Sequence, residues 1–578
     1  MKRLLGTAAL LISCASVVTA SELRETIERY DADRRAVSHL YSVCPSGRQG
    51  GSRRYGGCFE EPAAARLSRY RSFYQEWLGR LKGLDFDKLS QEGKIDYLLL
   101  DNHLRRELRQ LDLEATRLEE TGPFTPFAAA ILGLEDARRR MEPLDAAKAA
   151  AIVAALSAQV AGVRKQFQEK HERPAPAIRA AREVEKLRTI LRNWFEFYMG
   201  YDPLFTWWVE APFKDTDKAL QDYATFLREH VAGLQPSQLV GDPIGRDALL
   251  SELESEMVPY TPEELIDIAN REAAWCEAEL KKAAREMGYG DDWRKALEQV
   301  KTRHVEPGRQ PALIRDLARE AIEFVQKRNL LTLPPLALEN WRIEMMSPER
   351  QLVNPFFTGG DDIDVSYPVN TMSQEQKLMS MRGNNIYFAR ATVFHELIPG
   401  HHLQLFMAER YHPYRRQFGT PFYVEGWAVY WEMLLWDLNF DRTPEERVGA
   451  LFWRLHRCAR IVFSLSFHLG KMSPQECIDY LVDQVGHERA NAAAEVRRSI
   501  ADDYGPLYQA AYMVGALQLR ALRRELVERG KMSDREFHDA VLMENSIPIE
   551  MVRAALTRQK LGRDFRSSWK FYEDGRTR

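Results

Sequence analysis

Two stretches, FHELIPGHHLQ (394–404) and FYVEGWAVYWE (422–432), are the starting point for interpreting this chain. The first contains His395 followed by Glu396, which open the pattern His-Glu-x-x-His. In that pattern a helix places two His side chains on one face to bind zinc, and the Glu is free to act as a general base. A third ligand comes from a later helix, and Glu425 lies where such a ligand is expected.

The spacing of the histidines departs from this pattern. The residue four after His395 is Pro399, and the next histidines are His401 and His402. On an ideal helix His401 would lie about 240° around and about 9 Å along from His395, and His402 about 10 Å along. Zinc requires each ligand nitrogen at about 2.0–2.1 Å. A straight helix through this stretch therefore excludes a shared metal.

Pro399 and Gly400 predict a local departure from the helix. Proline has no N–H to bond the carbonyl of His395, and its ring clashes with that carbonyl. Glycine tolerates almost any backbone dihedrals. We expect a bulge of two residues that brings His401 to the place of an i+4 His, since bulges inside helices recur at functional sites.

A histidine on an apolar helix is most often an ordinary core residue. Here, however, three of the 13 His in 578 residues fall within eight positions, beside a Glu. That concentration favours a site for one zinc ion over a structural role. The predicted set comprises the ligands His395, His401 and Glu425, the base Glu396, and His402 as a reserve ligand or a group beside the metal.

HELIPGHHLQ followed by EGWAVYWE resembles the bacterial family called domain of unknown function 885, which is similar to zinc peptidases of the carboxypeptidase Taq and thermolysin-like (gluzincin) groups. The resemblance covers roughly residues 22–560 and extends to GDPIGRDALL (241–250), VPYTPEELIDIA (258–269), EVRRSI (495–500), PLYQAAYMVG (506–515) and FHDAVLMENSIPIEMV (537–552). Ser499 and Leu507 depart from the family's usual Tyr and Gly. The resemblance implies an α-helical fold with a peptidase-like site.

The resemblance also implies roles for residues near the C-terminus. Tyr512 matches the family's Tyr before x-x-Gly, and His468 falls where the family often has a His. In zinc peptidases a Tyr or His commonly stabilises the oxyanion of the tetrahedral intermediate. Tyr512 is therefore a candidate catalytic residue, with core packing as the alternative. Arg498 and Tyr508 are candidate substrate contacts.

Composition and the N-terminus indicate an exported protein. The chain is 45% hydrophobic and 29% charged with a net charge of −3, so no basic excess indicates nucleic acid binding. Lys2-Arg3 and the apolar residues that follow are typical of a signal peptide over 1–20. Val18-Thr19-Ala20 is one cleavage site. Leu11 to Cys14 also resembles a lipobox, which would give a lipid-anchored protein. No later run reaches the roughly 18 apolar residues of a membrane span.

The cysteines agree with export. Cys44 and Cys58 flank a polar, Gly- and Arg-rich loop, and we expect them to form a disulfide, with free thiols as the alternative. Cys276, Cys458 and Cys477 lie in helical patterns and are expected to be buried. No Cys-x-x-Cys pair indicates a cysteine zinc site.

Three- and four-residue apolar spacing over most of the chain predicts a mainly α fold. Four segments have the pattern of a capped helix start: TPEE (261–264), TPEE (443–446), SPQE (473–476) and SDRE (533–536). Residues 342–371 are the β-like region, where RQLVNPFF and DDIDVSYPVN are expected as short strands next to the metal site. They would form a structural hairpin or an edge for an extended peptide. Trp207-Trp208, expected in a loop, are more consistent with core packing than with a cleft.

These observations predict an exported zinc peptidase that cleaves oligopeptides by metal-activated water. The alternatives are a metallohydrolase of a non-peptide amide or cell-wall fragment, and an exported binding protein with a degenerate site. We expect an N-terminal helical region (21–340) and a C-terminal metal-site region (341–578), packed as one unit with a cleft. No nucleic acid partner is expected, and a membrane only through a lipid anchor.

Overall fold

The computed structural model describes residues 23–44, 58–168, 174–235, 238–351, 354–500 and 504–572. Within these ranges it has 23 α-helices and four short strands, which confirms the mainly α fold with a small β element. The predicted signal segment with Cys14, and the residues between Cys44 and Cys58, lie outside the described residues.

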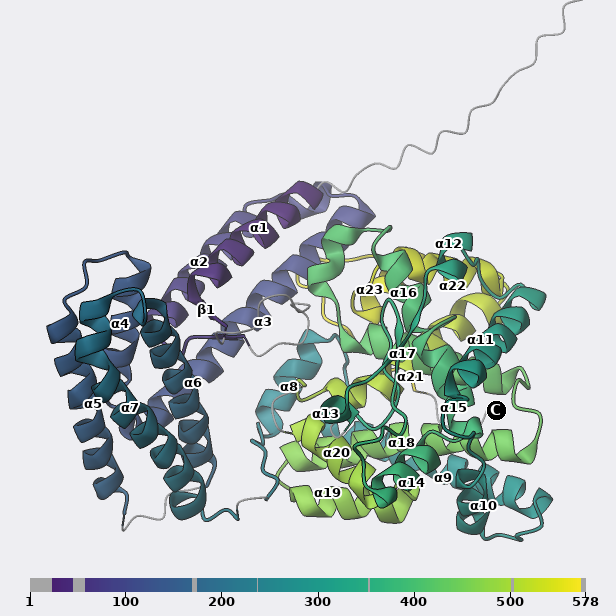
Figure 1. The fold of residues 1–578 in the computed structure, drawn as a ribbon. Helices are drawn as coiled ribbons and strands as arrows, with labels where there is room; N and C mark the ends of the chain where they lie inside the picture. Colours follow the sequence, from purple (N-terminus) through teal and green to yellow (C-terminus); the bar gives the residue numbers. More distant parts are fainter. Residues whose placement is uncertain are drawn as a thin grey trace, which may run out of the picture.

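The first three helices run beside one another and connect the right-hand part of the molecule with the lobe at the left of Figure 1. They are α1 (Arg24–Tyr41), α2 (Ala64–Lys82) and α3 (Gln91–Thr121). The strands β1 (Ser42–Val43) and β2 (Phe59–Glu60) form an antiparallel pair between α1 and α2. The disulfide Cys44–Cys58, with a sequence separation of 14, lies next to this pair, as the sequence predicted.

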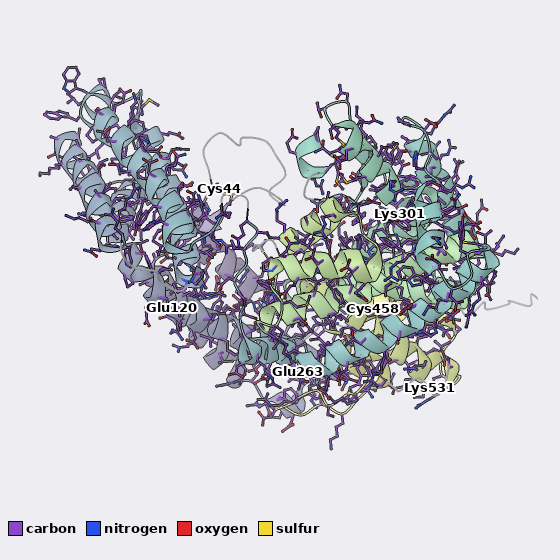
Figure 2. All side chains as sticks on the ribbon, turned by 90° about the horizontal axis from the view of Figure 1, so that it is seen from below. Cys44, Glu120, Glu263, Lys301, Cys458 and Lys531 are labelled. Carbon is purple, nitrogen blue, oxygen red and sulfur yellow. A yellow bond between two sulfur atoms is a disulfide. The ribbon has the colours of Figure 1, made fainter. Side chains whose placement is uncertain are left out.

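Four helices form a separate lobe at the end of α3, at the left of Figure 1. They are α4 (Ala128–Arg139), α5 (Ala146–Gln166), α6 (Pro174–Tyr198) and α7 (Pro203–Phe226). Their buried side chains, such as Val153, Leu156 and Trp194, make a core of their own. We call residues 124–232 the side lobe. In Figure 2, Glu120 marks the end of α3 that reaches this lobe.

The remaining helices and α1–α3 share one large core, which we call the body. Its helices before the candidate site are α8 (Arg246–Ser255), α9 (Pro262–Glu286), α10 (Trp293–Lys301), α11 (Gln310–Lys327), α12 (Pro335–Glu339), α13 (Pro348–Gln351) and α14 (Gln374–Gly383). The later ones are α15 (Ile386–Glu396), α16 (His401–Ala408), α17 (Pro421–Asp437), α18 (Pro444–His468), α19 (Pro474–Tyr480), α20 (Arg489–Ile500), α21 (Tyr508–Arg523), α22 (Asp534–Met543) and α23 (Ile549–Thr557). Figure 2 shows Cys458 of α18 inside the body.

The four predicted capped helix starts are all present. In each, the Ser or Thr side chain accepts from the backbone N–H three residues later, and the Glu side chain bonds back to the cap. These reciprocal bonds satisfy two backbone donors that a helix start leaves free. The caps belong to Thr261, Thr443, Ser473 and Ser533. Cys276, Cys458 and Cys477 are buried and unpaired with another cysteine, as expected.

The β-like region differs from the prediction in detail. Strands β3 (Ile343–Met345) and β4 (Ile363–Val365) pair in parallel, so they do not form a hairpin. Residues 350 and 351 belong to helix α13, which begins at Pro348, and the described residues 354–357 are not in a strand. Pro suits the first turn of a helix and cannot donate to a strand ladder. Strand β4 therefore runs in the same direction as β3.

Trp207 and Trp208 correct a second expectation. They lie on helix α7, not in a loop, and they are 82% and 50% exposed. The opposite face of α7 carries Phe205 and Val209, which are fully buried. Since side chains three and four residues apart share a helix face, burying Phe205 and Val209 turns the two tryptophans outward.

Among the described residues, one helix has the length and composition of a membrane span. This is the Ala-rich α5, of whose apolar window 33% is buried. Core helices of soluble proteins pass the same test. Here Val153, Leu156 and Val160 of α5 pack in the core of the side lobe.

Candidate metal centre

The stretch 394–404 folds as two helices separated by a sharp turn. Helix α15 ends at Glu396, and α16 begins at His401. The expected bulge inside one continuous helix is therefore wrong. The helix breaks because Pro399, in a cis peptide bond, offers no N–H, and the backbone N–H of Gly400 bonds instead to the carbonyl of Phe394 at 3.0 Å.

Glycine is required at position 400 because a side chain would have no room there, and not because of an unusual φ angle. A Cβ at this position would lie 1.8 Å from the carbonyl oxygen of His395. The turn is also held from the side, since the indole N–H of Trp427 donates to the carbonyl of Pro399 at 2.8 Å. The tight turn brings His401 back beside His395, although five residues lie between them.

The predicted ligands converge in the centre of the body. His395, Glu396 and His401 each offer a ligand atom within 4.8 Å of the others. Nε2 of His401 lies 3.2 Å from Oε2 of Glu425, and Nε2 of His395 lies 3.8 Å from the same oxygen. All four side chains are buried.

These distances suit a single tetrahedral ion. Two ligand atoms at about 2.0–2.1 Å from zinc lie about 3.4 Å apart when the geometry is tetrahedral. The separations of 3.2 and 3.8 Å from Glu425 to the two imidazoles bracket that value. Two imidazoles and one carboxylate are also a donor set that zinc uses in catalytic sites. The residues therefore fit a zinc ion.

Glu432 is a functional candidate that sequence reasoning missed. Its Oε1 accepts from Nδ1 of His395 at 2.7 Å and from Arg457 of α18 at 3.1 Å. Such a carboxylate orients a metal-binding His and leaves Nε2 free for the ion. Glu432 is seven residues after Glu425, two helical turns along the same face of α17. That spacing in EGWAVYWE was the available signal.

Burial and charge shift the pKa values of these groups. Burial opposes the charged form of His395, but hydrogen bonds with Glu425 and Glu432 outweigh it and raise its pKa to about 9. Burial also raises the pKa of Glu396, which the neighbouring imidazoles only partly offset. For Glu425 the charges of the two imidazoles outweigh burial and hold its pKa well below the usual value. A raised pKa suits Glu396 for accepting and returning a proton.

Helix α21 places two tyrosines beside the cluster. The hydroxyl of Tyr508 donates to Oε1 of Glu425, the oxygen that does not face the imidazoles. The ring of Tyr512 stacks on His395, with ring centres 6.4 Å apart and planes inclined by 12°. Burial raises the pKa of both phenols above the ordinary value. Both phenols therefore stay neutral, and their hydroxyls can donate hydrogen bonds.

The approach of α21 to α17 depends on two glycines. A Cβ on Gly515 would lie 1.8 Å from the carbonyl oxygen of Phe422, and a Cβ on Gly426 would lie 2.7 Å from the backbone of Gly515. Glycine at both positions lets the two backbones touch. The Tyr-x-x-Gly pattern of 512–515 therefore brings the tyrosine to the cluster through a close helix contact.

His402 and His468 do not join the cluster. Nδ1 of His402 lies 2.9 Å from the carbonyl of Asp361, and its Nε2 lies 3.0 Å from the carbonyl of Ala337, so this side chain ties α16 to α12 and the β region. His468 is buried at the far end of α18, eleven residues beyond Arg457, or about 16 Å along the axis. Burial lowers its pKa to about 4.

Arg498 belongs to a buried ionic network next to the cluster. It pairs with Glu495 at 3.0 Å, and Arg460 of α18 donates to the same carboxylate at 2.6 Å. The guanidinium of Arg460 lies 4.2 Å from the ring centre of Tyr512. Arg498 also donates to Asn354 at 3.4 Å. The network therefore contacts the ring of Tyr512 through Arg460.

The β region lies directly against the cluster, as predicted. A Cβ on Gly359 would come 2.4 Å from Oε2 of Glu396, so the loop between α13 and β4 passes over this carboxylate. A separate cavity of about 660 Å³ lies between α3, α8 and the C-terminal segment, and none of the cluster residues line it.

Fold and site together define a mainly helical protein with a buried cluster of His and Glu side chains whose ligand atoms lie close to one another. The model of the family described as "Bacterial protein of unknown function (DUF885)" matches residues 49–556, so the chain belongs to this family. No curated protein matches the chain.

Two solved structures share the fold. One, described as a candidate lipoprotein of unknown function from Shewanella oneidensis, is 20% identical with a TM-score of 0.67, covering 93% of this chain and 100% of that one. The other, described as a candidate lipoprotein from Colwellia psychrerythraea, is 16% identical with a TM-score of 0.58, covering 93% of this chain and 97% of that one.

Proposed function

We propose that the protein is a zinc-dependent hydrolase, with peptides as its substrates. The observation that carries the proposal is the convergence of His395, His401 and Glu425 at separations that suit one ion. A degenerate site would be expected to leave the imidazole nitrogens more than about 5 Å apart, with no route to a shared ion. The ligand atoms of His395 and His401 lie within 4.8 Å of each other, which argues against that alternative.

The side chains around the ion have separate tasks in this proposal. When bound, zinc lowers the pKa of a water and polarises a carbonyl. Glu396, which faces His395 at 4.0 Å but is not needed as a ligand, accepts the proton of the attacking water and returns it to the leaving amine. Glu432 fixes the ring of His395. Tyr512 is the candidate donor to the oxyanion.

We also propose that the protein is exported and held at a membrane by a lipid. The supporting observations are the N-terminal segment with Lys2-Arg3 and Cys14, and the description of both similar structures as candidate lipoproteins. Labelling of cells with a radioactive or clickable fatty acid tests the anchor. Label that disappears in Cys14→Ser supports it, and an unlabelled wild type contradicts it.

Elemental analysis of the purified protein tests the metal site. We expect about one zinc per chain in the wild type and loss of zinc in His401→Ala and Glu425→Ala. His402→Ala is the matched control, since this neighbouring His points to α12 and should keep the metal. A wild type that stays free of metal after zinc is supplied would contradict the proposal.

A peptide library tests the reaction. Glu396→Gln should retain zinc but lose hydrolysis by about 10²–10⁴-fold, the usual contribution of a general base. A panel of non-peptide amides and cell-wall fragments is run beside the library. If the protein cleaves members of that panel but no peptide, the substrate class is a non-peptide amide or a cell-wall fragment, and the peptide part of the proposal is wrong.

A further inference from the structure

Large apolar side chains gather on one exposed end of the side lobe. Six of them lie within twelve residues at the connection of α6 and α7. Together with Met141 at the end of α4, they make seven of the fourteen large hydrophobic residues that are exposed among the described residues. We call this group the apolar tip: Phe197, Met199, Tyr201, Leu204, Trp207 and Trp208, with Met141 beside them.

The ordered backbone of this region directs the side chains of the apolar tip toward the outside of the lobe. Leu204, Trp207 and Trp208 share one face of α7, while Phe205 on the opposite side is fully buried. Asp202 caps α7 by accepting from two backbone N–H groups at 3.0 Å, which orders the connection. Leu204 is 68% exposed and Trp207 is 82% exposed. A group of exposed apolar side chains gathered in one place is typical of an interaction site.

Two contacts place Tyr201 and the end of α4 beside Phe197. The ring centres of Phe197 and Tyr201 are 6.5 Å apart. The guanidinium of Arg138, three residues before Met141, lies 4.7 Å from the ring centre of Phe197. Arg140 is exposed and pairs with Glu142 at 2.9 Å. The tip thus has an aromatic centre and, on the α4 side, a rim of two arginines that are each ion-paired with a glutamate.

We propose that the apolar tip inserts into the surface of a lipid bilayer. Trp and Tyr are the residues that favour the boundary between headgroups and acyl chains. Arginines at the rim would remain at the level of the headgroups. The neighbouring helix α5 adds apolar surface to the same lobe, because only 33% of its apolar window is buried. A bilayer accepts such an apolar, sparsely charged surface.

With the lipid proposed above at Cys14, the position of the tip relative to the N-terminus favours a bilayer over another occupant. Arg139 of α4 donates to the carbonyl of Leu40 at 3.1 Å, so the last turn of α1 lies beside the end of α4. Helix α1 has 18 residues, a length of about 27 Å. Eight residues separate Cys14 from Leu23, and they reach at most about 28 Å. A lipid at Cys14 and the tip can therefore contact one membrane.

The proposal does not depend on the metal site, and it is tested with vesicles. The chain from Ser21 onward retains every described residue and has no Cys14 to carry a lipid. It is mixed with vesicles of three parts phosphatidylethanolamine to one part phosphatidylglycerol, and binding is measured by flotation. Quenching of tryptophan fluorescence by brominated lipids reports insertion.

We expect the wild type to float with vesicles and to be quenched. In Leu204→Ser/Trp207→Ser, vesicle affinity should fall by about tenfold or more, since two large side chains no longer leave water. The matched control is Leu336→Ser/Leu378→Ser, which removes two exposed leucines of the body. It should bind as the wild type does. Thermal melting confirms that both variants are folded.

Three results would overturn the proposal. The first is a wild type that does not float. The second is equal binding by the tip variant and the wild type. The third is a concentration-dependent dimer, seen by analytical ultracentrifugation and abolished by the tip variant while vesicle binding is absent, which would assign the tip to a second copy of this chain.

Discussion

At the scale of single residues, the carboxylate of Glu432 fixes the orientation of the His395 ring. It accepts from Nδ1 at 2.7 Å and is itself held by Arg457 at 3.1 Å. We predict that Glu432→Gln lowers zinc affinity by about 10–100-fold, the usual effect of losing such a partner. Competition with a chromophoric chelator measures the affinity.

The control for Glu432→Gln is Glu409→Gln, an exposed carboxylate just after α16, which should leave zinc affinity unchanged. Thermal melting of the metal-free variants separates an effect on the ion from an effect on folding. If Glu432→Gln binds zinc as tightly as the wild type, this residue does not position His395.

Glu550 gives a pH dependence that is independent of the metal site. Burial raises its pKa to about 7, against a usual value of 4.5, and its Oε2 has no hydrogen-bond partner among the described residues. Between pH 4.5 and about 7 the folded chain holds a proton that the unfolded chain releases. The free energy of unfolding therefore falls as pH rises through this window, by at most about 1.4 kcal/mol per pH unit, and levels above it.

Glu550→Gln should remove this dependence. The variant should match the wild type near pH 4.5 and exceed its stability at pH 8, as measured by urea denaturation at a series of pH values. Glu528→Gln, on the surface, should show no such trend. A stability gain that is the same at every pH would contradict the assigned cause.

At the scale of elements, the contact between α17 and α21 sets the distance from the tyrosines to the cluster. We predict that Gly515→Ala destabilises the fold by about 1–3 kcal/mol, because its Cβ would lie 1.8 Å from the carbonyl of Phe422 and the helices must separate. Zinc affinity should fall as well, since Glu425 lies on α17 and is bonded by Tyr508. Chemical denaturation and chelator competition measure the two effects.

Gly162→Ala is the matched control, because it makes the same change inside a helix where nothing lies within 4 Å of the new Cβ. It should stabilise the protein by about 0.5–1 kcal/mol through the better helix propensity of Ala. Equal effects of the two substitutions would show that the close contact does not matter.

At the scale of the whole molecule, the side lobe and the body have separate cores. We predict that Leu156→Ala, a fully buried residue of α5, destabilises the side lobe by about 2–5 kcal/mol and leaves zinc content unchanged. Hydrogen exchange should rise in residues 124–232 and stay constant in α15–α18.

Leu465→Ala, fully buried in α18, is the comparison. It should raise exchange in the body and lower zinc content. Loss of zinc in Leu156→Ala would mean that the lobe and the body unfold as one unit. The domain boundary expected near residue 340 stays a prediction, although the core of the body contains residues from both sides of it.

Local chemistry in the sequence determined the helices, their capped starts and the candidate metal donors. The Ser or Thr caps at positions such as 261 and 443 act over three residues, so they can be recognised without knowledge of the fold. The same holds for the disruption at Pro399 and Gly400, because a missing N–H is a property of the residue.

The tertiary structure alone decided which groups meet. Sequence left His401 and His402 as alternatives, and the direction of the chain after the break placed His401 in the cluster and His402 against α12. Glu432, and the exposure of Trp207, likewise depend on contacts with distant helices. The spacing of apolar residues predicts that a helix has an apolar face. Which distant side chains pack against that face is decided only when helices far apart in the sequence come together.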